Sequence, residues 1–118
     1  MAQVRSYQMD IYGAWLHLAT DRRGWGTLRR RFENVPPADA IGFTSFVVKR
    51  DGVHICMFLD MGILDGNNVG LVEMLTHEAT HASTMLLDHI GEEYNGQSEA
   101  LAYLTGFIAA WLWIGCNG

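Results

Sequence analysis

A long helical pattern with two histidines one turn apart constrains this chain more than any other feature of its sequence. The spacing of apolar residues predicts a helix from Gly70 to Ile90, with Gly91 as its C-cap. His77 and His81 lie within it, and because each residue of an α-helix advances about 100°, both imidazoles share one stripe. The opposite side gathers apolar residues: Val72, Leu75, Ala79, Ala82, Leu86 and Ile90. We therefore expect one face of this helix to meet the core and another to bind a ligand.

The residues between the histidines indicate what that ligand is. His77-Glu78-Ala79-Thr80-His81 has the pattern HExxH. A catalytic zinc site takes three protein ligands and keeps one position open for water, which Glu78 could reach as a general base. We expect His77 and His81 to bind one Zn²⁺, although the same ligand types also accept Co, Ni or Mn. The alternative is a helix whose two histidines are solvated and incidental.

A third ligand has to come from another part of the chain. Residues farther along the helix rise ~1.5 Å each, so Asp88 lies about 10 Å beyond His81 and is out of reach. Glu99 follows a polar connection of residues 92–97 and falls in the first turn of the next helix. We expect Glu99 to be the third ligand and Tyr103, one turn further on, to hydrogen-bond a developing oxyanion. The alternative for Tyr103 is a tyrosine satisfied at the edge of the core.

The last helix is predicted to run from a cap at Ser98 to about Trp113. Gly106 and Ala110 continue the stripe of Glu99, and we expect such small side chains to let this helix pack closely on the motif helix. Its strongly apolar part covers about 16 residues, short of the ~20 that span a bilayer, so no membrane span is expected. The bulky residues near its end suit the core, a homo-oligomer interface or contact with a membrane surface: Phe107, Trp111, Leu112 and Trp113.

The first third of the chain carries one strand and one helix. Residues Met9–Ala19 show partial alternation and few charges, which favours a strand, with a helix as the alternative. Thr20 or Asp21 then caps a helix in which apolar residues recur at spacings of three and four. Pro36 and Pro37 cannot continue a helical ladder, so the helix has to end before them.

Two β-rich segments, Phe43–Arg50 and Val53–Asp60, precede the motif helix. Asp51-Gly52 between them favours a type I′ hairpin turn, and residues 61–68 are rich in turn formers, which predicts a loop. An extended substrate could pair with whichever of these strands lies at the edge of the sheet. His17 and His54 fall in predicted strands, where a lone histidine is more often hydrogen-bonded than a metal ligand.

Composition narrows the class of protein. The 118 residues, 49% of them hydrophobic, suit a single domain over residues 1–118. The formal net charge of −5 gives no general attraction for nucleic acid, although five arginines between residues 22 and 31 form a local basic run that we expect to be a solvated helix face. Cys56 and Cys116 are expected to be free thiols. With no apolar segment near Met1 to act as a secretion signal, we expect a cytoplasmic protein.

The sequence HEATH, a short connection and then SEALAY on an apolar helix resemble the gluzincins, the thermolysin-like clan of HExxH zinc peptidases with a downstream Glu. The chain is also similar to the minimal members of that clan and to small HExxH proteins encoded by phages. The resemblance covers residues 42–113. It implies zinc on His77, His81 and Glu99, with Glu78 as the base. The implied fold is α+β: a minimal zincin-like domain in which a short, mostly antiparallel sheet of about three strands packs on three helices, with the motif on the central one.

Larger gluzincins have an Asn before the third-ligand Glu, where this chain has Ser98. The residues that orient the ligands are therefore not assigned by the resemblance. The function it implies is a metallopeptidase that cleaves a peptide or protein substrate. The alternative, from another class, is a zinc-stabilised interaction protein, for example a phage-encoded modulator of a host protein, with little or no proteolytic activity.

Overall fold

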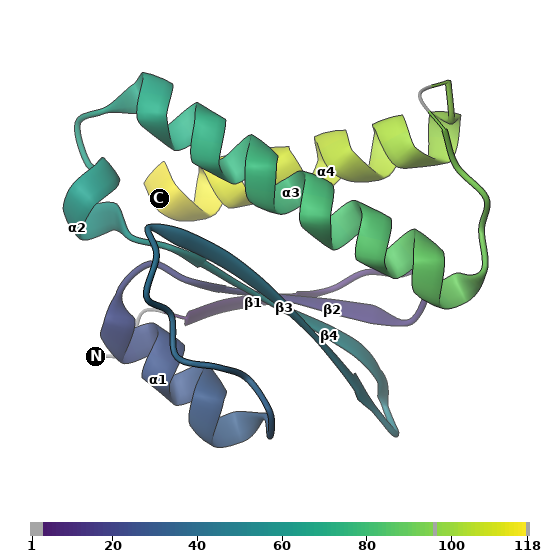
Figure 1. Cartoon of the computed structure of the whole chain (residues 1–118), viewed down its shortest axis with the longest axis horizontal. Helices are drawn as coiled ribbons and strands as arrows, with labels where there is room; N and C mark the ends of the chain where they lie inside the picture. Colours follow the sequence, from purple (N-terminus) through teal and green to yellow (C-terminus); the bar gives the residue numbers. More distant parts are fainter. Residues whose placement is uncertain (1–3, 96, 118) are drawn as a thin grey trace.

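A four-stranded mixed sheet separates two layers of helices (Figure 1). The computed structural model describes residues 4–95 and 97–117. The strand order is β1-β2-β4-β3, so that β1 and β3 are the two edges. The short helix α1 lies on one face, and the long helices α3 and α4 lie on the other. The predicted α+β class is confirmed, with four strands and four helices in place of about three of each.

The strands pair in both directions. β1 (Val4–Gln8) is antiparallel to β2 (Ala14–Ala19), and β2 is parallel to β4 (Gly52–Leu59). β3 (Gly42–Lys49) is antiparallel to β4. The central parallel pair needs a crossover, which α1 (Arg22–Arg31) begins on one face of the sheet. Residues 32–41 then lead to the outer strand β3.

The prediction for residues 9–19 was half right. Only Ala14–Ala19 forms a strand, because Tyr12 and Gly13 have positive φ angles of 64° and 58° and turn the chain. That turn joins β2 to β1, whose residues are mostly exposed and polar. β1 therefore carries no hydrophobic alternation from which it could have been predicted.

The hairpin of β3 and β4 is confirmed, but its turn is not Asp51-Gly52. Lys49 pairs with Gly52, so Arg50 and Asp51 are the two loop residues and Gly52 begins β4. Gly52 has a φ of 126° and lies so close to Gly13 that a Cβ atom would collide with the Gly13 carbonyl oxygen. Glycine is therefore needed at position 52 both for the backbone conformation of the hairpin and for the close contact between the two turns.

The helix ends follow local capping chemistry. The Asp21 side chain accepts a hydrogen bond from the Gly24 amide at 2.7 Å, which confirms Asp21 as the cap of α1. Gly91 ends α3 (Asn68–Ile90) in the left-handed conformation at φ 75°, and Ser98 accepts from the Leu101 amide at the start of α4 (Glu99–Asn117). The predicted loop 61–68 contains one short helix, α2 (Met61–Leu64).

Each face of the sheet has its own core. Under α3 and α4 the buried side chains include Leu16, Ile55, Leu75, Leu86 and Ile108, and under α1 they include Trp25, Leu28, Phe32, Cys56 and Phe58. The predicted core face of α3 is confirmed at its centre. Val72 and Ile90, at its ends, are exposed.

The predicted packing of the last helix is wrong. Its buried residues are Leu104, Ile108, Trp111 and Leu112, whereas Glu99, Tyr103, Gly106 and Ala110 are exposed. The stripe of small residues therefore faces away from α3. Larger aliphatic side chains form the contact because the apolar residues on that side of the helix bury more surface than glycine and alanine do.

The last helix is also longer than predicted. α4 has 19 residues, and an 18-residue window in it has a mean hydropathy of 1.4 with 17% of its residues buried. By length and composition alone it could cross a membrane, which is weak evidence because core helices of soluble proteins pass the same test. The expected absence of a membrane span, and the expected homo-oligomer through this helix, stay predictions.

The free thiols are confirmed among the described residues. Burial raises the pKa of Cys56 to about 12 and that of Cys116 to about 11. Both sulfurs therefore stay protonated near neutral pH and are poor nucleophiles.

A chain of hydrogen bonds on the α1 face links three strands and the hairpin turn. His17 Nδ1 lies 2.7 Å from Ser6 Oγ, and His17 Nε2 lies 2.9 Å from His54 Nδ1. His54 Nε2 lies 2.8 Å from Asp51 Oδ1. The pattern is satisfied with both rings neutral, when the Ser6 hydroxyl donates to His17 and each ring donates to its next neighbour. Burial, followed by the nearby His54 and Arg31, lowers the pKa of His17 to about 4.

We predict that His17 makes the folded chain sensitive to mild acid. The unfolded chain takes up a proton at His17 as the pH falls through 6.5, but the folded chain does so only near pH 4. The contribution of His17 to stability is thus complete above pH 6.5 and is lost as the pH falls from 6.5 toward 4. Denaturant unfolding at pH 7.5 and pH 5 should show a smaller decrease in the free energy of unfolding for His17→Gln than for the unaltered protein. Equal decreases in the two proteins would contradict this assignment.

Candidate metal site

The two motif histidines converge on one point beside α3. Both side chains are exposed, their ring centroids are 4.6 Å apart and their Nε2 atoms are 3.1 Å apart. Two nitrogens bound to one tetrahedral zinc at about 2.0–2.1 Å would be roughly 3.3 Å apart. The rings therefore have nearly the separation that a shared metal ion requires, and the chemistry of the pair fits zinc.

The motif carboxylate lies next to the pair but is oriented toward the sheet. Glu78 is 2% exposed, and the Thr44 hydroxyl of β3 donates a hydrogen bond to its Oε1 atom at 2.6 Å. Oε2 has no hydrogen-bond partner among the described residues. Since an O–H···O bond to a carboxylate is strong at this distance, Thr44 fixes the orientation of the carboxyl group and leaves Oε2 available.

The first residue of β3 makes room for this carboxyl group. A Cβ atom at Gly42 would lie 3.0 Å from Glu78 Oε2 and 2.6 Å from Met74 Cε. Any side chain at position 42 would therefore press on the free oxygen of Glu78. Glycine is needed here for a close approach of strand and helix, since its own backbone has no positive φ.

The histidines and Glu78 share a small cavity between α3 and the edge strand. Its volume is about 260 Å³, and α3 contributes His77, Glu78, His81 and Met85 while β3 contributes Gly42, Phe43 and Thr44. The sheet order makes β3 an edge strand and β4 an interior one. Of the two strands that could pair with an extended substrate, only β3 has a free edge beside this cavity.

Glu99 is not brought to the histidine pair. It is exposed at the start of α4, and α4 lies toward β1, the edge opposite β3 (Figure 1). α4 contacts β1 directly, because the ring centroids of Tyr7 in β1 and Phe107 in α4 are 5.8 Å apart. Within residues 4–95 and 97–117, no group of three His, Cys, Asp or Glu residues could hold a metal ion. The expected role of Glu99 as third ligand stays a prediction that this arrangement does not support.

Tyr103 lies in a different cavity from Glu78. Its side chain is 76% exposed and lines an apolar hollow of about 530 Å³ between α4 and the turn from β1 to β2. None of the residues around that hollow lines the histidine cavity. Tyr103 is therefore not placed to donate to an oxyanion formed beside Glu78.

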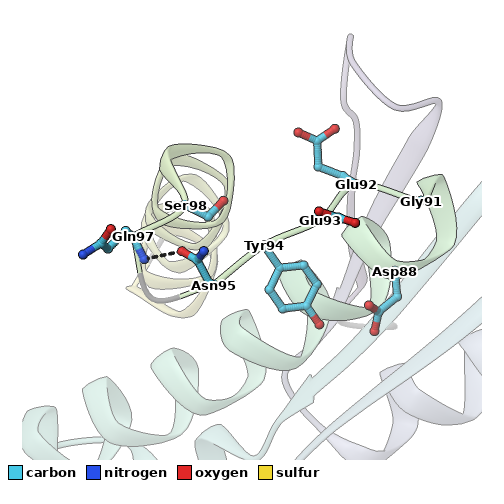
Figure 2. Close-up of a pocket in the computed structure, with 8 residues that line it drawn as sticks. All are labelled: Asp88, Gly91, Glu92, Glu93, Tyr94, Asn95, Gln97 and Ser98. Atoms are coloured by element: carbon cyan, nitrogen blue, oxygen red, sulfur yellow. Dashed lines mark hydrogen bonds between the residues drawn. The ribbon is translucent and has the colours of Figure 1, made fainter.

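The connection from α3 to α4 surrounds a third, larger hollow of about 960 Å³ (Figure 2). Its acidic groups are Asp88, Glu92 and Glu93, and neither motif histidine reaches it. Burial and then Asp88 raise the pKa of Tyr94, whose ring lies between the two ends of the connection. The side chain of Asn95 accepts a hydrogen bond from the Gln97 amide at 2.8 Å, so the turn before α4 is held locally.

Sequence reasoning missed Thr44 and Gly42. Both lie in the predicted strand segment or next to it, but threonine is common in strands and glycine in turns, so neither attracts notice alone. The relevant signal was indirect: an edge strand was expected beside the cleft. A polar residue at an inward position of that strand was the only available pointer to a partner for Glu78.

Comparison of the chain with protein-family models, curated proteins and solved structures found no significant match. The interpretation of the site therefore depends on its own geometry and chemistry.

We predict that Thr44→Val destabilises the fold through Glu78. Valine keeps the shape of threonine but removes the hydroxyl, so a buried carboxyl oxygen loses its donor, at a cost of about 1–3 kcal/mol in the free energy of unfolding. Thr27→Val is the matched control, because the Thr27 hydroxyl is exposed and bonds within its own helix. In a Glu78→Gln background the effect of Thr44→Val should shrink. An unchanged effect there would show that Thr44 acts independently of Glu78.

Proposed function

We propose that this protein is a zinc-dependent hydrolase, with peptides or proteins as its substrates. The single observation that carries the proposal is the shared cavity in which the His77 and His81 nitrogens lie 3.1 Å apart beside the Glu78 carboxyl group. The HExxH pattern and the open edge of β3 support it further. The zincin-like fold belongs to the same proposal, which keeps the HExxH residues of the gluzincin resemblance and not its downstream Glu ligand.

Four residues of the cavity have a defined part in this chemistry. His77 and His81 hold the ion, and bound zinc would lower the pKa of a water ligand and polarise a carbonyl oxygen. With zinc bound, Glu78 would take a proton from the water through its free Oε2 atom and would later deliver it to the leaving amine. Thr44 positions Glu78 by holding Oε1. β3 orients an extended peptide by backbone pairing.

His77 and His81 lie together, but within residues 4–95 and 97–117 no third His, Cys, Asp or Glu joins them, whereas a catalytic zinc site usually has three protein ligands. The proposal therefore assigns the metal to His77 and His81 and leaves Glu99 outside the ligand set. Water and substrate would fill the remaining positions around a bound ion. This arrangement favours weaker metal binding than a complete gluzincin ligand set would give.

We predict that zinc binding depends on the histidines and not on Glu99. His77→Ala and His81→Ala should each weaken zinc binding by about tenfold or more, because each removes one of the two nitrogens. Glu99→Gln should leave the affinity within about twofold, because Glu99 is exposed at the start of α4, toward the edge of the sheet opposite β3. Isothermal titration of metal-free protein with zinc measures all three. A loss of zinc affinity in Glu99→Gln as large as in His77→Ala would show that Glu99 is the third ligand.

A second candidate function is an interaction protein in which zinc serves stability. The observation that favours it is the outer face of α4, where Tyr103, Phe107, Trp113 and Ile114 are 38–76% exposed. Large apolar side chains gathered on one helix face often mark a contact surface. In this case zinc binding would stabilise the folded state, and Glu78 would not act as a general base.

One substitution separates the two candidates. For a hydrolase, Glu78→Gln should lower peptide cleavage by at least ~10²-fold through loss of the general base, with zinc affinity and secondary structure retained. Zinc-loaded protein is incubated with a denatured protein mixture, and newly formed peptide N-termini are counted by mass spectrometry. His89→Gln serves as the control, because His89 is exposed on the same helix outside the cavity. Equal numbers of new termini with Glu78→Gln and the unaltered protein would refute the hydrolase.

A further inference from the structure

The α1 face of the sheet carries a further cavity, away from the motif histidines. Its volume is about 650 Å³, within the range of small-molecule sites, and it opens between the end of α1 and the turn of the hairpin. It is on the opposite side of the sheet from α3 (Figure 1). Any ligand there is independent of the proposed zinc site.

Two buried histidines form the floor of this cavity. His17 and His54 are 3% and 5% exposed, and all four of their ring nitrogens are engaged in the hydrogen-bond chain from Ser6 to Asp51. The Trp15 indole stacks nearly parallel to both rings, at interplanar angles of 2° and 10°. The histidines thus have no free donor or acceptor for a ligand, and they hold the indole in place.

The rim is positively charged in a chain that is negative overall. Arg31, Lys49 and Arg50 line the cavity together with one carboxylate, Asp51, which is engaged with His54. Within residues 4–95 and 97–117 Arg22–Asp60 is the salt bridge of an arginine or lysine, so Arg31, Lys49 and Arg50 have no carboxylate within 4.0 Å. Lys49 does lie over the Phe32 ring, at 5.5 Å from its centroid. The cavity therefore has an excess of positive charge to offer an anion.

One of the residues that line this cavity has a buried donor without an acceptor. Trp15 Nε1 is the buried side-chain nitrogen or oxygen that lacks a hydrogen-bond partner in the described part of the chain. A buried N–H without an acceptor costs about 1–3 kcal/mol, so such groups are rare unless a ligand or water completes them. The indole of Trp25 shows the normal case, because its Nε1 atom donates to the Pro36 carbonyl oxygen at 2.9 Å.

We propose that this cavity binds a small phosphate monoester, with Arg31, Lys49 and Arg50 contacting the phosphate group beside Trp15. A monoester carries nearly two negative charges at neutral pH, which matches the charge excess of the rim. Guanidinium groups fit phosphate oxygens in pairs, and the volume leaves room for the organic group that carries the phosphate.

Phenyl phosphate serves as the probe, followed by the indole N–H signals in two-dimensional NMR of the whole chain. The signal of Trp15, assigned as the one missing in Trp15→Phe, should shift and saturate, while that of Trp25 should stay in place. Phenol, and sodium chloride at matched ionic strength, should move neither signal. Equal shifts with phenol would overturn the proposal in favour of an apolar site, and equal shifts with chloride would reduce the effect to charge screening.

The rim residues provide the second half of the test. Arg31→Gln with Arg50→Gln should raise the Kd for phenyl phosphate at least tenfold, whereas Arg23→Gln, an exposed arginine of the same helix outside the cavity, should leave it within twofold. The same spectra report whether each variant is folded. An unmoved Trp15 signal at saturating probe, or an unchanged Kd in the double variant, would overturn the site. Neither result bears on zinc binding or cleavage, which are measured separately.

Discussion

The parallel pairing of β2 with β4 is the constraint from which the rest of the architecture follows. Because two parallel neighbours need a crossover, α1 has to occupy one face of the sheet and the chain has to return through β3 on the outside. The other face is then left for α3 and α4. This arrangement puts the motif helix beside β3 and the last helix beside β1, and so determines which residues can meet.

The hydrogen bond from Thr44 to Glu78 forms at the candidate site because this arrangement places β3 beside α3. It joins residues 34 positions apart, and it fixes a carboxyl group that would otherwise be buried without a donor. The histidines need no such support, because the helix alone places them one turn apart. The site therefore combines a local element that helix geometry guarantees with a long-range element that only the fold supplies.

The contrast explains what could be predicted from the sequence. The motif helix with its Gly91 cap, the hairpin and the cap at Asp21 depend on local spacing and turn chemistry, and all were predicted. The positions of Glu99 and Tyr103 depend on which side of α4 packs inward, and Leu104, Ile108 and Leu112 decided that against the stripe of small residues. The strand β1 was missed because its exposed residues carry no apolar pattern. The periodicity of apolar residues indicates which face of a helix or strand is buried. It does not indicate which neighbouring element that face contacts.

The free side of β3 has a consequence for the chain in solution. Eight residues of extended backbone end the sheet there, and unpaired amides and carbonyls on such a border attract any other extended chain, including another copy of the same protein. Lys49 and Arg50 at the hairpin end add positive charge that repels an identical strand laid against it. The unpaired edge of β3 thus favours self-association, and the positive charge at the tip of the hairpin opposes it.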